Sequence, residues 1–400
     1  MSRARSFGST AGVLALAGAM AAGCSAAPAP AAIPFRLIGS TVLLPVHIER
    51  SDTLWFILDT GASGGAVDLP RAVQLGLHFE KGESEARGSG GTVSSHHLRP
   101  IEIQLGSIRL RSNQYSAFPL PALAQRMGHV VDGIVGSDLF RRYVVDIDYR
   151  ARVLRLYEPS SFRYRGSGER LSLTYTNNHP YVHARIELAD GRKIDGRFVV
   201  DSGSSQGVIL LHEFAERESV AATVAKTVPV SGLGVCGETA SHIGRIAGLE
   251  LGSLRLAAPL LTLPPAGPGE FATRGSAGNL GGAILKKFRC VFDYSRSALI
   301  LEPATDLNEP IPFDASGLSL VTAVAAFDTI VVARVIPGSP AEAAGLRPGD
   351  TIETLDDVPA ATLGVLGLRE RLRNQGELVR LEVARGDRKW TVSLLLRDLL

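Results

Sequence analysis

The chain contains two copies of one pattern, in which an apolar stretch runs directly into an acid, a hydroxyl residue and a glycine. The first copy is FILDTGASGGAVD, residues 56–68, and the second is RFVVDSGSSQGVIL, residues 197–210. A carboxylate at the end of a buried strand loses water, so unless it is paired it costs free energy or takes up a proton. Asp59 and Asp201 therefore either brace turns, for which this composition is ordinary, or take part in chemistry.

Two further markers repeat in the same order. GIVGSDLFRRYVVDIDY (133–149) aligns without gaps with GNLGGAILKKFRCVFDY (278–294), and IEIQLGSIRL (101–110) matches IAGLELGSLRL (246–256). Self-similarity on this scale indicates two copies of one lobe, over 35–160 and 161–303, each with one Asp. The 43 Gly, 22 Pro and 45% apolar content suit many short strands joined by turns. We therefore expect a mainly β fold with two tandem β-barrel lobes.

The first 34 residues have a different character. Arg3 and Arg5 precede an apolar stretch too short to span a bilayer, and AMAAGC ends at Cys24. Residues 1–24 resemble a bacterial lipoprotein signal with Cys24 as the lipidated residue; the alternative is a secretory signal cleaved near Ala22 or Ala27. The Ala/Pro-rich stretch 25–34 predicts a tether. We expect an exported protein on the periplasmic face of the envelope, anchored in the membrane by the lipid.

The remaining composition excludes several partners. The net charge is +2 with interspersed bases, which gives no nucleic-acid signal. The cysteines have no metal-like spacing, and the His pairs 96–97 and 179/183 are better explained as solvated residues, so neither metal nor cofactor is expected. Cys236 and Cys290 leave two alternatives open, a disulfide or two separate thiols.

A third unit, residues 317–400, follows a linker over 304–316. It contains GSPAEAAGLRPGD and resembles a PDZ domain, with Gly317, Leu318, Ser319 and Leu320 standing where that family has its carboxylate-binding loop. The resemblance implies that protein C-termini bind there, with the peptide added as a strand to the sheet edge. The pattern also predicts a helix over 362–376 with Thr362 as its N-cap and Gly376 at its end.

The two lobes together resemble aspartic proteases of the pepsin and retropepsin type. The resemblance implies that Asp59 and Asp201 meet as a catalytic dyad across the lobe interface. It implies that Thr60 and Ser202 cross-link the two loops by hydrogen bonds, and that Gly61 and Gly203 let the backbones approach. Because both lobes lie in one chain, the resemblance implies a monomer.

The same resemblance implies two flaps over the cleft. They are the hairpin over 87–97, with Gly90 and Gly91, and the hairpin over 231–238, with Gly232 and Gly234. The segments around Gly136 and Gly281 would pack behind the two Asp loops.

The two copies also differ near their acids. Asn279 breaks the apolar pair before Gly281, and Ala62 lacks the hydroxyl that Ser204 supplies. We expect that hydroxyl to favour ionised Asp201.

These features lead to one functional expectation and two alternatives. We expect an aspartic endopeptidase that hydrolyses polypeptides with a dyad-activated water, and a PDZ unit that recognises substrates or partners. The first alternative is a catalytically silent peptide-binding or scaffold protein of the envelope. The second is a pair of β lobes whose Asp residues only brace turns.

Overall fold

The computed structural model describes residues 1, 30–88, 90–265, 275–323 and 327–400. Cys24 and the signal predicted over 1–24 lie outside the described residues, apart from Met1. In the described part of the chain, no helix is both long and apolar enough to cross a bilayer.

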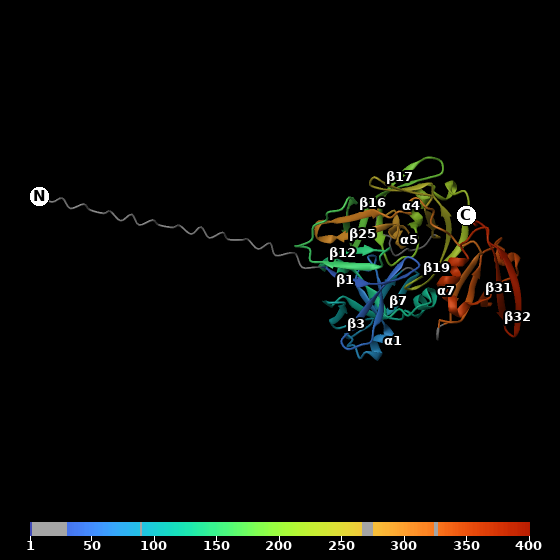
Figure 1. Cartoon of the computed structure of the whole chain (residues 1–400), viewed down its shortest axis with the longest axis horizontal. Coiled ribbons are helices and arrows are strands. Elements are labelled where there is room, and N and C mark those ends of the chain that lie inside the picture. Colours follow the sequence, from blue (N-terminus) through green and yellow to red (C-terminus); the bar gives the residue numbers. More distant parts are fainter. Residues whose placement is uncertain (2–29, 89, 266–274, 324–326) are drawn as a thin grey trace.

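A six-stranded sheet joins the two copies of the repeat. Its order is β1-β13-β12-β25-β26-β14, so strands of the first copy pair directly with strands of the second. Figure 1 shows this sheet between the lobes. Its strands are β1 (Ala31–Pro34), β12 (Val144–Asp148), β13 (Val153–Tyr157), β14 (Glu169–Ser172), β25 (Phe288–Asp293) and β26 (Ala298–Pro303).

The predicted tether over 25–34 is wrong for its last four residues. Residues 31–34 form β1, which pairs antiparallel with β13, and Ile33 lies opposite Leu154. The Ile33 side chain is only 1% exposed. Burial of this apolar side chain and pairing with the sheet edge outweigh the Ala/Pro composition. Residues 25–29 lie outside the described residues.

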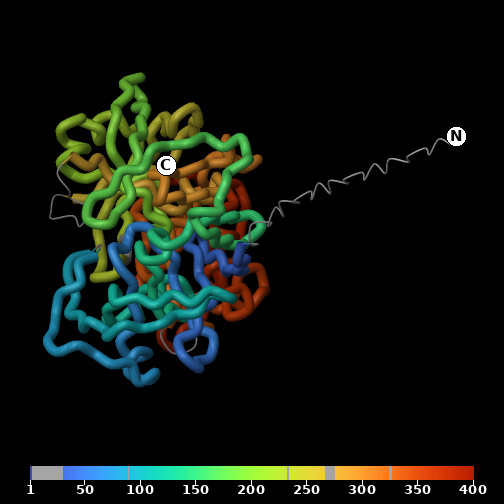
Figure 2. The backbone as a smooth tube through the Cα atoms, turned by 90° about the vertical axis from the view of Figure 1, so that its left-hand side faces the viewer, coloured from blue at the N-terminus to red at the C-terminus, as the bar shows by residue number. Residues whose placement is uncertain are grey.

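Each copy also builds a sheet of its own, and the two sheets have the same strand order. The first is β6-β7-β10-β5-β11-β4-β3-β8-β9 with β2 on β3; the second is β19-β20-β23-β18-β24-β17-β16-β21-β22 with β15 on β16. The sequence repeat is thus a structural repeat. Figure 2 shows the two lobes stacked, the first from blue to green and the second from green to orange.

The strands of the first sheet are β2 (Arg36–Ile38), β3 (Thr41–Ile48), β4 (Leu54–Leu58), β5 (Gly65–Asp68), β6 (Ser84–Gly88), β7 (Gly91–His97), β8 (Ile101–Leu105), β9 (Ile108–Ser112), β10 (Tyr115–Phe118) and β11 (Gly133–Val135). Those of the second are β15 (Thr174–Thr176), β16 (His179–Glu187), β17 (Lys193–Asp201), β18 (Val208–Leu210), β19 (Val228–Gly234), β20 (Gly237–Arg245), β21 (Gly248–Leu251), β22 (Leu254–Ala257), β23 (Leu260–Leu263) and β24 (Gly278–Gly281). Short helices connect them: α1 (Leu69–Gln74), α2 (Pro121–Met127), α3 (Ser137–Arg142), α4 (His212–Arg217) and α5 (Gly282–Leu285).

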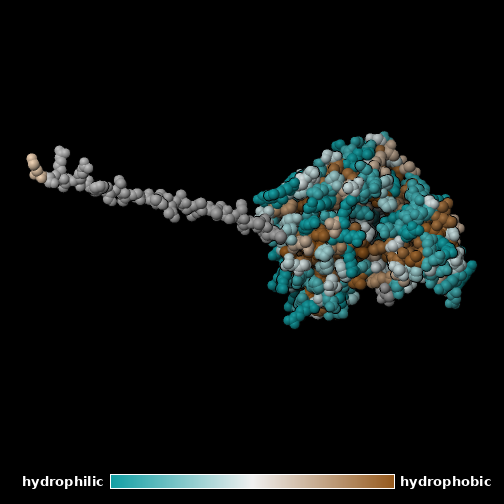
Figure 3. Space-filling view, in the orientation of Figure 1, coloured by the Kyte–Doolittle hydropathy of each residue, from teal (hydrophilic) through white to brown (hydrophobic). Residues whose placement is uncertain are grey.

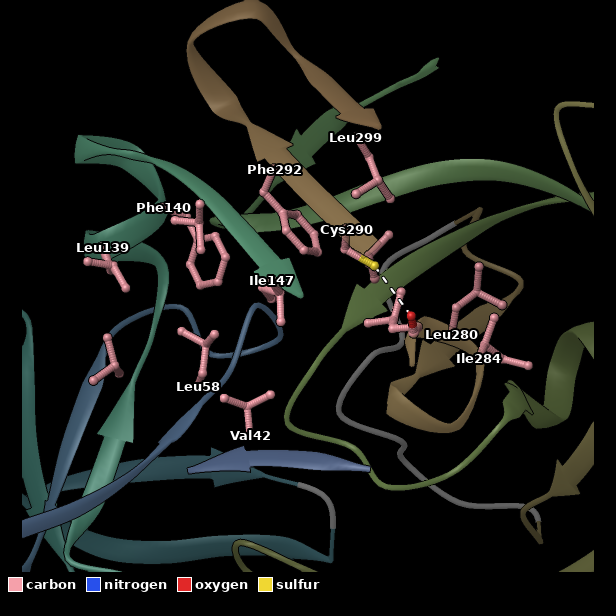
Figure 4. Close-up of a cluster of buried hydrophobic side chains, with 14 of the residues drawn as sticks. Val42, Leu58, Leu139, Phe140, Ile147, Leu280, Ile284, Cys290, Phe292 and Leu299 are labelled. Atoms are coloured by element: carbon pink, nitrogen blue, oxygen red, sulfur yellow. Dashed lines mark hydrogen bonds between the residues drawn. The ribbon is translucent and has the colours of Figure 1, made fainter. Parts of the chain in front are cut away.

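One apolar core runs through both lobes. Phe140 of the first lobe packs edge-on against Phe292 of the second, with ring centroids 5.3 Å apart. Figure 4 shows this contact, together with Cys290, whose thiol donates to the Leu285 carbonyl at 3.4 Å. The Cys236 thiol lies on the Ala86 carbonyl, and the two cysteines are not bonded to each other, so the structure supports two separate thiols. Burial raises the pKa of the Cys290 thiol well above its usual range.

The C-terminal unit has its own sheet and its own core. The sheet order is β27-β28-β29-β31-β32, which makes β27 an edge strand, and β30 pairs with β29. Its elements are β27 (Leu318–Thr322), β28 (Ile330–Val335), α6 (Pro340–Ala343), β29 (Thr351–Leu355), β30 (Val358–Pro359), α7 (Ala360–Arg371), β31 (Leu378–Arg385) and β32 (Arg388–Leu395).

Helix α7 begins two residues before the predicted N-cap. Thr362 therefore lies inside the element, where Pro359 is the N-cap residue, and the prediction of Thr362 as N-cap is wrong. Gly364 interrupts the helix with φ 64° and ψ 171°, and Gly376 lies beyond its end. The helix therefore starts earlier than predicted, and the kink at Gly364 divides what was predicted as one continuous helix.

The C-terminal unit packs against both lobes. The Thr322 hydroxyl at the end of β27 donates to the Gln125 carbonyl of α2 at 2.9 Å. Arg334 of β28 forms an ion pair with Glu238 of β20 in the second lobe, at 3.4 Å. Figure 1 shows this unit, in orange and red, beside β19 of the second lobe. The three parts are thus held in a defined arrangement.

Candidate active site

The two Asp residues occupy equivalent places in the two sheets. Asp59 follows the end of β4, and Asp201 is the last residue of β17. Each strand pairs in parallel with the short strand behind it, β11 in the first lobe and β24 in the second. The Asp59 N–H donates to the Val135 carbonyl at 2.9 Å, and the Gly282 N–H donates to the Ser204 carbonyl at 2.7 Å. The segments around Gly136 and Gly281 therefore pack behind the loops, as predicted.

Thr60 and Ser202 cross-link the two loops through four buried hydrogen bonds. The Thr60 hydroxyl donates to the Val200 carbonyl at 2.7 Å and accepts from the Ser202 N–H at 2.9 Å. The Ser202 hydroxyl donates to the Leu58 carbonyl at 2.8 Å and accepts from the Thr60 N–H at 3.0 Å. Both side chains are 0% exposed. This reciprocal pattern fixes the relative position of the strand ends that hold Asp59 and Asp201.

Each glycine of the two loops lies against the carboxyl group of the opposite lobe. A Cβ atom added to Gly61 would lie 2.7 Å from Asp201 Cγ, and one added to Gly203 would lie 2.3 Å from Asp59 Cγ. Neither approach leaves room for a side chain. The loops thus bring the two carboxyl groups together across the lobe interface.

Backbone N–H groups hold both carboxyl groups in place. Gly61 N–H donates to Asp59 Oδ1 at 2.7 Å. Gly203 and Ser204 N–H both donate to Asp201 Oδ1 at 2.9 Å. Asp201 is buried, with 5% of its surface exposed.

Asn279 is a site residue whose role the sequence reasoning missed. Its side-chain amide donates to Asp201 Oδ2 at 2.6 Å, and the residue is 1% exposed. The equivalent position of the first lobe holds Ile134, which has no hydrogen-bonding side chain. The break in the apolar pair before Gly281 was the signal that marked this position.

The expectation that the Ser204 hydroxyl donates to Asp201 is wrong. The Ser204 hydroxyl accepts from the Gln206 N–H at 3.3 Å, and Ser204 reaches Asp201 through its backbone N–H. The side-chain donor to the Asp201 carboxyl is instead the amide of Asn279. The two lobes therefore differ in the donors around their acids, but through a different residue from the one expected.

Two hairpins cover the dyad and meet at their tips. They are β6–β7 and β19–β20, and the Cys236 thiol donates to the Ala86 carbonyl at 3.6 Å. A Cβ atom added to Gly90 would lie 2.4 Å from the Gly237 carbonyl oxygen. Gly90 and Gly91 have φ values of 101° and 125° and form the first turn. In the second hairpin Gly232 and Gly234 lie on β19, and Gly237, with φ 144°, is the first residue of β20.

The loop predicted to bind carboxylates leads into edge strand β27. Gly317 has φ 86°, and its N–H donates to Asp314 Oδ2 at 2.5 Å. The Leu318 N–H donates to the Ser316 hydroxyl at 3.0 Å. Two amides of the predicted loop are thus engaged within the chain, while Leu318, Ser319 and Leu320 line a cavity.

That cavity is shared with the dyad. It has a volume of about 1450 Å³ and is lined by Asp59, Asp201, both hairpins and strand β27. Among the residues with a described placement, no group of three or more His, Cys, Asp and Glu could hold a metal ion. Both carboxyl groups thus line one cavity of about 1450 Å³, together with the two hairpins and strand β27.

Comparisons with protein families give the class of both units. Residues 44–139 match a family model described as aspartyl protease, and residues 331–385 match one described as PDZ domain. The first range contains Asp59, whereas Asp201 lies outside it in the second copy. The chain is therefore mainly β, with a protease domain followed by a PDZ domain.

One curated relative is similar over a short stretch. It is named "Putative serine protease HhoA" from Synechocystis sp. and is 36% identical over 67 residues. The match covers 17% of this chain and 17% of that relative.

Proposed function

We propose that this protein is an aspartic endopeptidase that hydrolyses peptide bonds of extended polypeptides. The reciprocal packing of Gly61 on the Asp201 carboxyl and of Gly203 on the Asp59 carboxyl carries the proposal, because it brings the two acids together. Two carboxyl groups at such a site share one proton, since like charges in contact do not both ionise readily. The ionised member takes a proton from a water, and the protonated member donates to the carbonyl oxygen of the scissile bond.

The duplicated architecture supports the same proposal. The identical strand order of the two lobes, the joining sheet and the Thr60–Ser202 cross-link match what a bilobal pepsin-like enzyme requires. The two hairpins line the cleft and contact each other, and in the proposed enzyme they close over the bound peptide and displace water, which strengthens electrostatic interactions inside. A purely structural brace needs one acid for each turn, but it does not need two carboxyl groups facing each other in a cavity.

Serine chemistry, which the name of the HhoA relative raises, has less support in this cleft. The Ser116 hydroxyl lies 3.1 Å from His97 Nδ1, across neighbouring strands β10 and β7. A serine nucleophile needs a histidine that a third group orients. In the part of the chain with described structure, no carboxylate forms an ion pair with His97.

Replacement of either acid tests the proposed function. We expect Asp59→Asn and Asp201→Asn each to abolish hydrolysis of an unfolded polypeptide, because either change removes the shared-proton arrangement. A statine-type transition-state mimic should block the wild type, and a serine-directed reagent should not. Circular dichroism and thermal unfolding serve as controls for folding. Substantial activity in either variant would contradict the catalytic role of the two Asp residues. An inactive wild type that still binds peptides would favour the alternative of a catalytically silent peptide-binding protein.

We also propose that the protein works at the periplasmic face of the envelope, anchored through Cys24. The lipoprotein-like signal and Cys24 support this location. Cys24→Ser should move the protein from the membrane fraction to the soluble fraction. The control variant Ser25→Ala should stay in the membrane fraction. Unchanged fractionation of Cys24→Ser would show that the attachment is of another kind.

A further inference from the structure

The cavity that holds the dyad extends without a break to the PDZ domain. Its walls include the Asp59 and Asp201 carboxyl groups, the edge strand β27 and helix α7. An extended peptide in the cleft and a peptide added to β27 would therefore occupy one connected space. The residues that line the cavity between the dyad and β27 therefore decide which peptides can occupy the cleft and pair with β27 at the same time.

Four cationic side chains from three parts of the chain line this connecting region. They are Arg126 of α2, Lys286 after α5, Arg369 of α7 and Arg373 just beyond it, and we call them the cationic junction. All four side chains are partly buried. Arg126 donates to the Ser231 carbonyl at 3.4 Å, and Arg369 donates to the Leu320 carbonyl at 2.5 Å. Carbonyl groups satisfy the donors but do not neutralise the charge.

The cationic junction has no direct ion pair in the described part of the chain, although Asp314 and Glu370 line the same cavity. Among the residues that the structure describes, no carboxylate lies within 4.0 Å of these four groups, although fourteen other arginines form such pairs. The nearby Glu370 is exposed, and the Asp314 carboxyl is engaged by Ser316 and Gly317. Burial, with repulsion from Arg126 and Arg373, lowers the pKa of Arg369 to about 10. Burial and the charge of Arg373 lower the pKa of Lys286. Repulsion of this kind is relieved when an anion binds.

We propose that the cationic junction binds acidic side chains of the polypeptide substrate. The proposal rests on the proposed function and names its substrate class: extended polypeptides with Asp or Glu in the segment that runs between the dyad and β27. A side chain fits better than a C-terminal carboxylate, because the Gly317 and Leu318 amides are already engaged within the chain. A peptide fits better than a larger polyanion, because the junction lies inside a cleft under two hairpins.

Peptide binding to the Asp201→Asn variant of the full chain tests the inference without any need for hydrolysis. The probes are fluorescent peptides of one unfolded sequence, with either Glu or Gln at the variable positions and with a free or an amidated C-terminus. We expect the Glu peptides to bind about tenfold or more tightly than the Gln peptides, whichever C-terminus they carry, because charge-assisted hydrogen bonds contribute most. This preference should weaken as the salt concentration rises.

Variants of the junction locate the effect. Arg369→Gln and Arg373→Gln should each reduce the Glu-to-Gln ratio several-fold, and the double variant should bring it close to one. Arg388→Gln, an exposed change on the opposite edge strand β32, is the matched control and should leave the ratio unchanged. Thermal unfolding identifies a variant that fails to fold. In that case Lys286→Met, in the second lobe, tests the same reduction of the Glu-to-Gln ratio independently.

The outcomes separate this inference from the proposed function. Equal affinity for Glu and Gln peptides, a ratio that survives the double variant, or a preference set only by the free C-terminus would overturn the inference. Competition by millimolar inorganic phosphate that is as strong as competition by the Glu peptide would do the same, since it would show a general anion site. A wild type that shows the preference but hydrolyses nothing would contradict only the enzymatic function. Hydrolysis without the preference would contradict only the inference.

Discussion

At the scale of single residues, Asn279 is the group that makes the two acids different. Its amide donates to Asp201 Oδ2 at 2.6 Å, while the backbone N–H groups of Gly203 and Ser204 donate to Oδ1, so both oxygens of that carboxyl are held in place. The equivalent residue of the first lobe is Ile134, whose side chain has no donor. Asn279 is therefore a positioning residue for Asp201 in one lobe alone.

Asn279→Ile, which copies Ile134 of the first lobe, should lower kcat/KM by about tenfold or more. The variant loses a hydrogen bond to a carboxyl group, a contribution of about 1.5 to 3 kcal/mol, and the Asp201 carboxyl is then held less firmly. The measurement is kcat/KM on one peptide at one pH, with thermal unfolding as the check that the variant folds.

Ser204→Ala is the control for this loss, because Ser204 contacts Asp201 through its backbone N–H, which the variant keeps. Its kcat/KM should match that of the wild type. If the Ser204 variant loses activity and the Asn279 variant does not, the hydroxyl is the positioning donor and our assignment fails.

At the scale of secondary-structure elements, Gly364 controls the path of α7 along the cavity that α7 and β27 line. Its φ of 64° and ψ of 171° belong to a region that only glycine enters readily. The break turns the first residues of α7 away from the helix that carries Arg369. The groove wall therefore depends on one backbone conformation.

Gly364→Ala should destabilise the PDZ domain by about 1 to 3 kcal/mol, because the added Cβ is strained in this conformation. Gly367→Ala lies in the helical part of α7 and should change stability by less than about 1 kcal/mol, since the gain in helix propensity is offset by a tight contact with Leu363. Urea unfolding followed by Trp390 fluorescence in a Trp55→Phe background measures both. Equal effects of the two changes would refute this explanation.

The elements also show how far the sequence alone determines the fold. The repeat predicted two lobes, and the Thr60–Ser202 cross-link was implied by the family resemblance of the two Asp loops. Strand β1 escaped prediction because its stability comes from a partner strand more than a hundred residues away, against its own Ala/Pro composition. The Asn279 amide and the contact of Cys236 with Ala86 depend on side-chain directions across a lobe interface, which no local pattern encodes.

At the scale of the whole molecule, Asp314 lies where the linker joins the PDZ domain. Its carboxyl group accepts hydrogen bonds from the Ser316 hydroxyl and the Gly317 N–H. Burial outweighs these bonds and raises the pKa of Asp314 to about 6. The Asp314 carboxyl, at the start of the PDZ domain, therefore titrates in a mildly acidic range.

The contribution of Asp314 to stability should fall as the pH rises from about 4 to about 6. In that window the folded state binds more protons than the unfolded state, whose Asp has a pKa near 3.9, so the free energy of unfolding decreases with pH. The difference between wild type and Asp314→Asn isolates this group from the other acids. Urea unfolding at pH 4 and pH 6.5, read by Trp390, should give the larger difference in favour of the wild type at pH 4. A difference that does not vary with pH, or that grows with it, would contradict the burial of this carboxyl.

The joining of both lobes in one polypeptide has a consequence for how such a site changes by mutation. In an assembly of two identical subunits, each codon specifies both halves, so a substitution beside one acid appears beside the other as well. Here the position that holds Asn279 in one half holds Ile134 in the other, because each half has its own codon. A duplicated gene can therefore inherit an asymmetric pair of acids, and selection can adjust one of them while the other stays as it is.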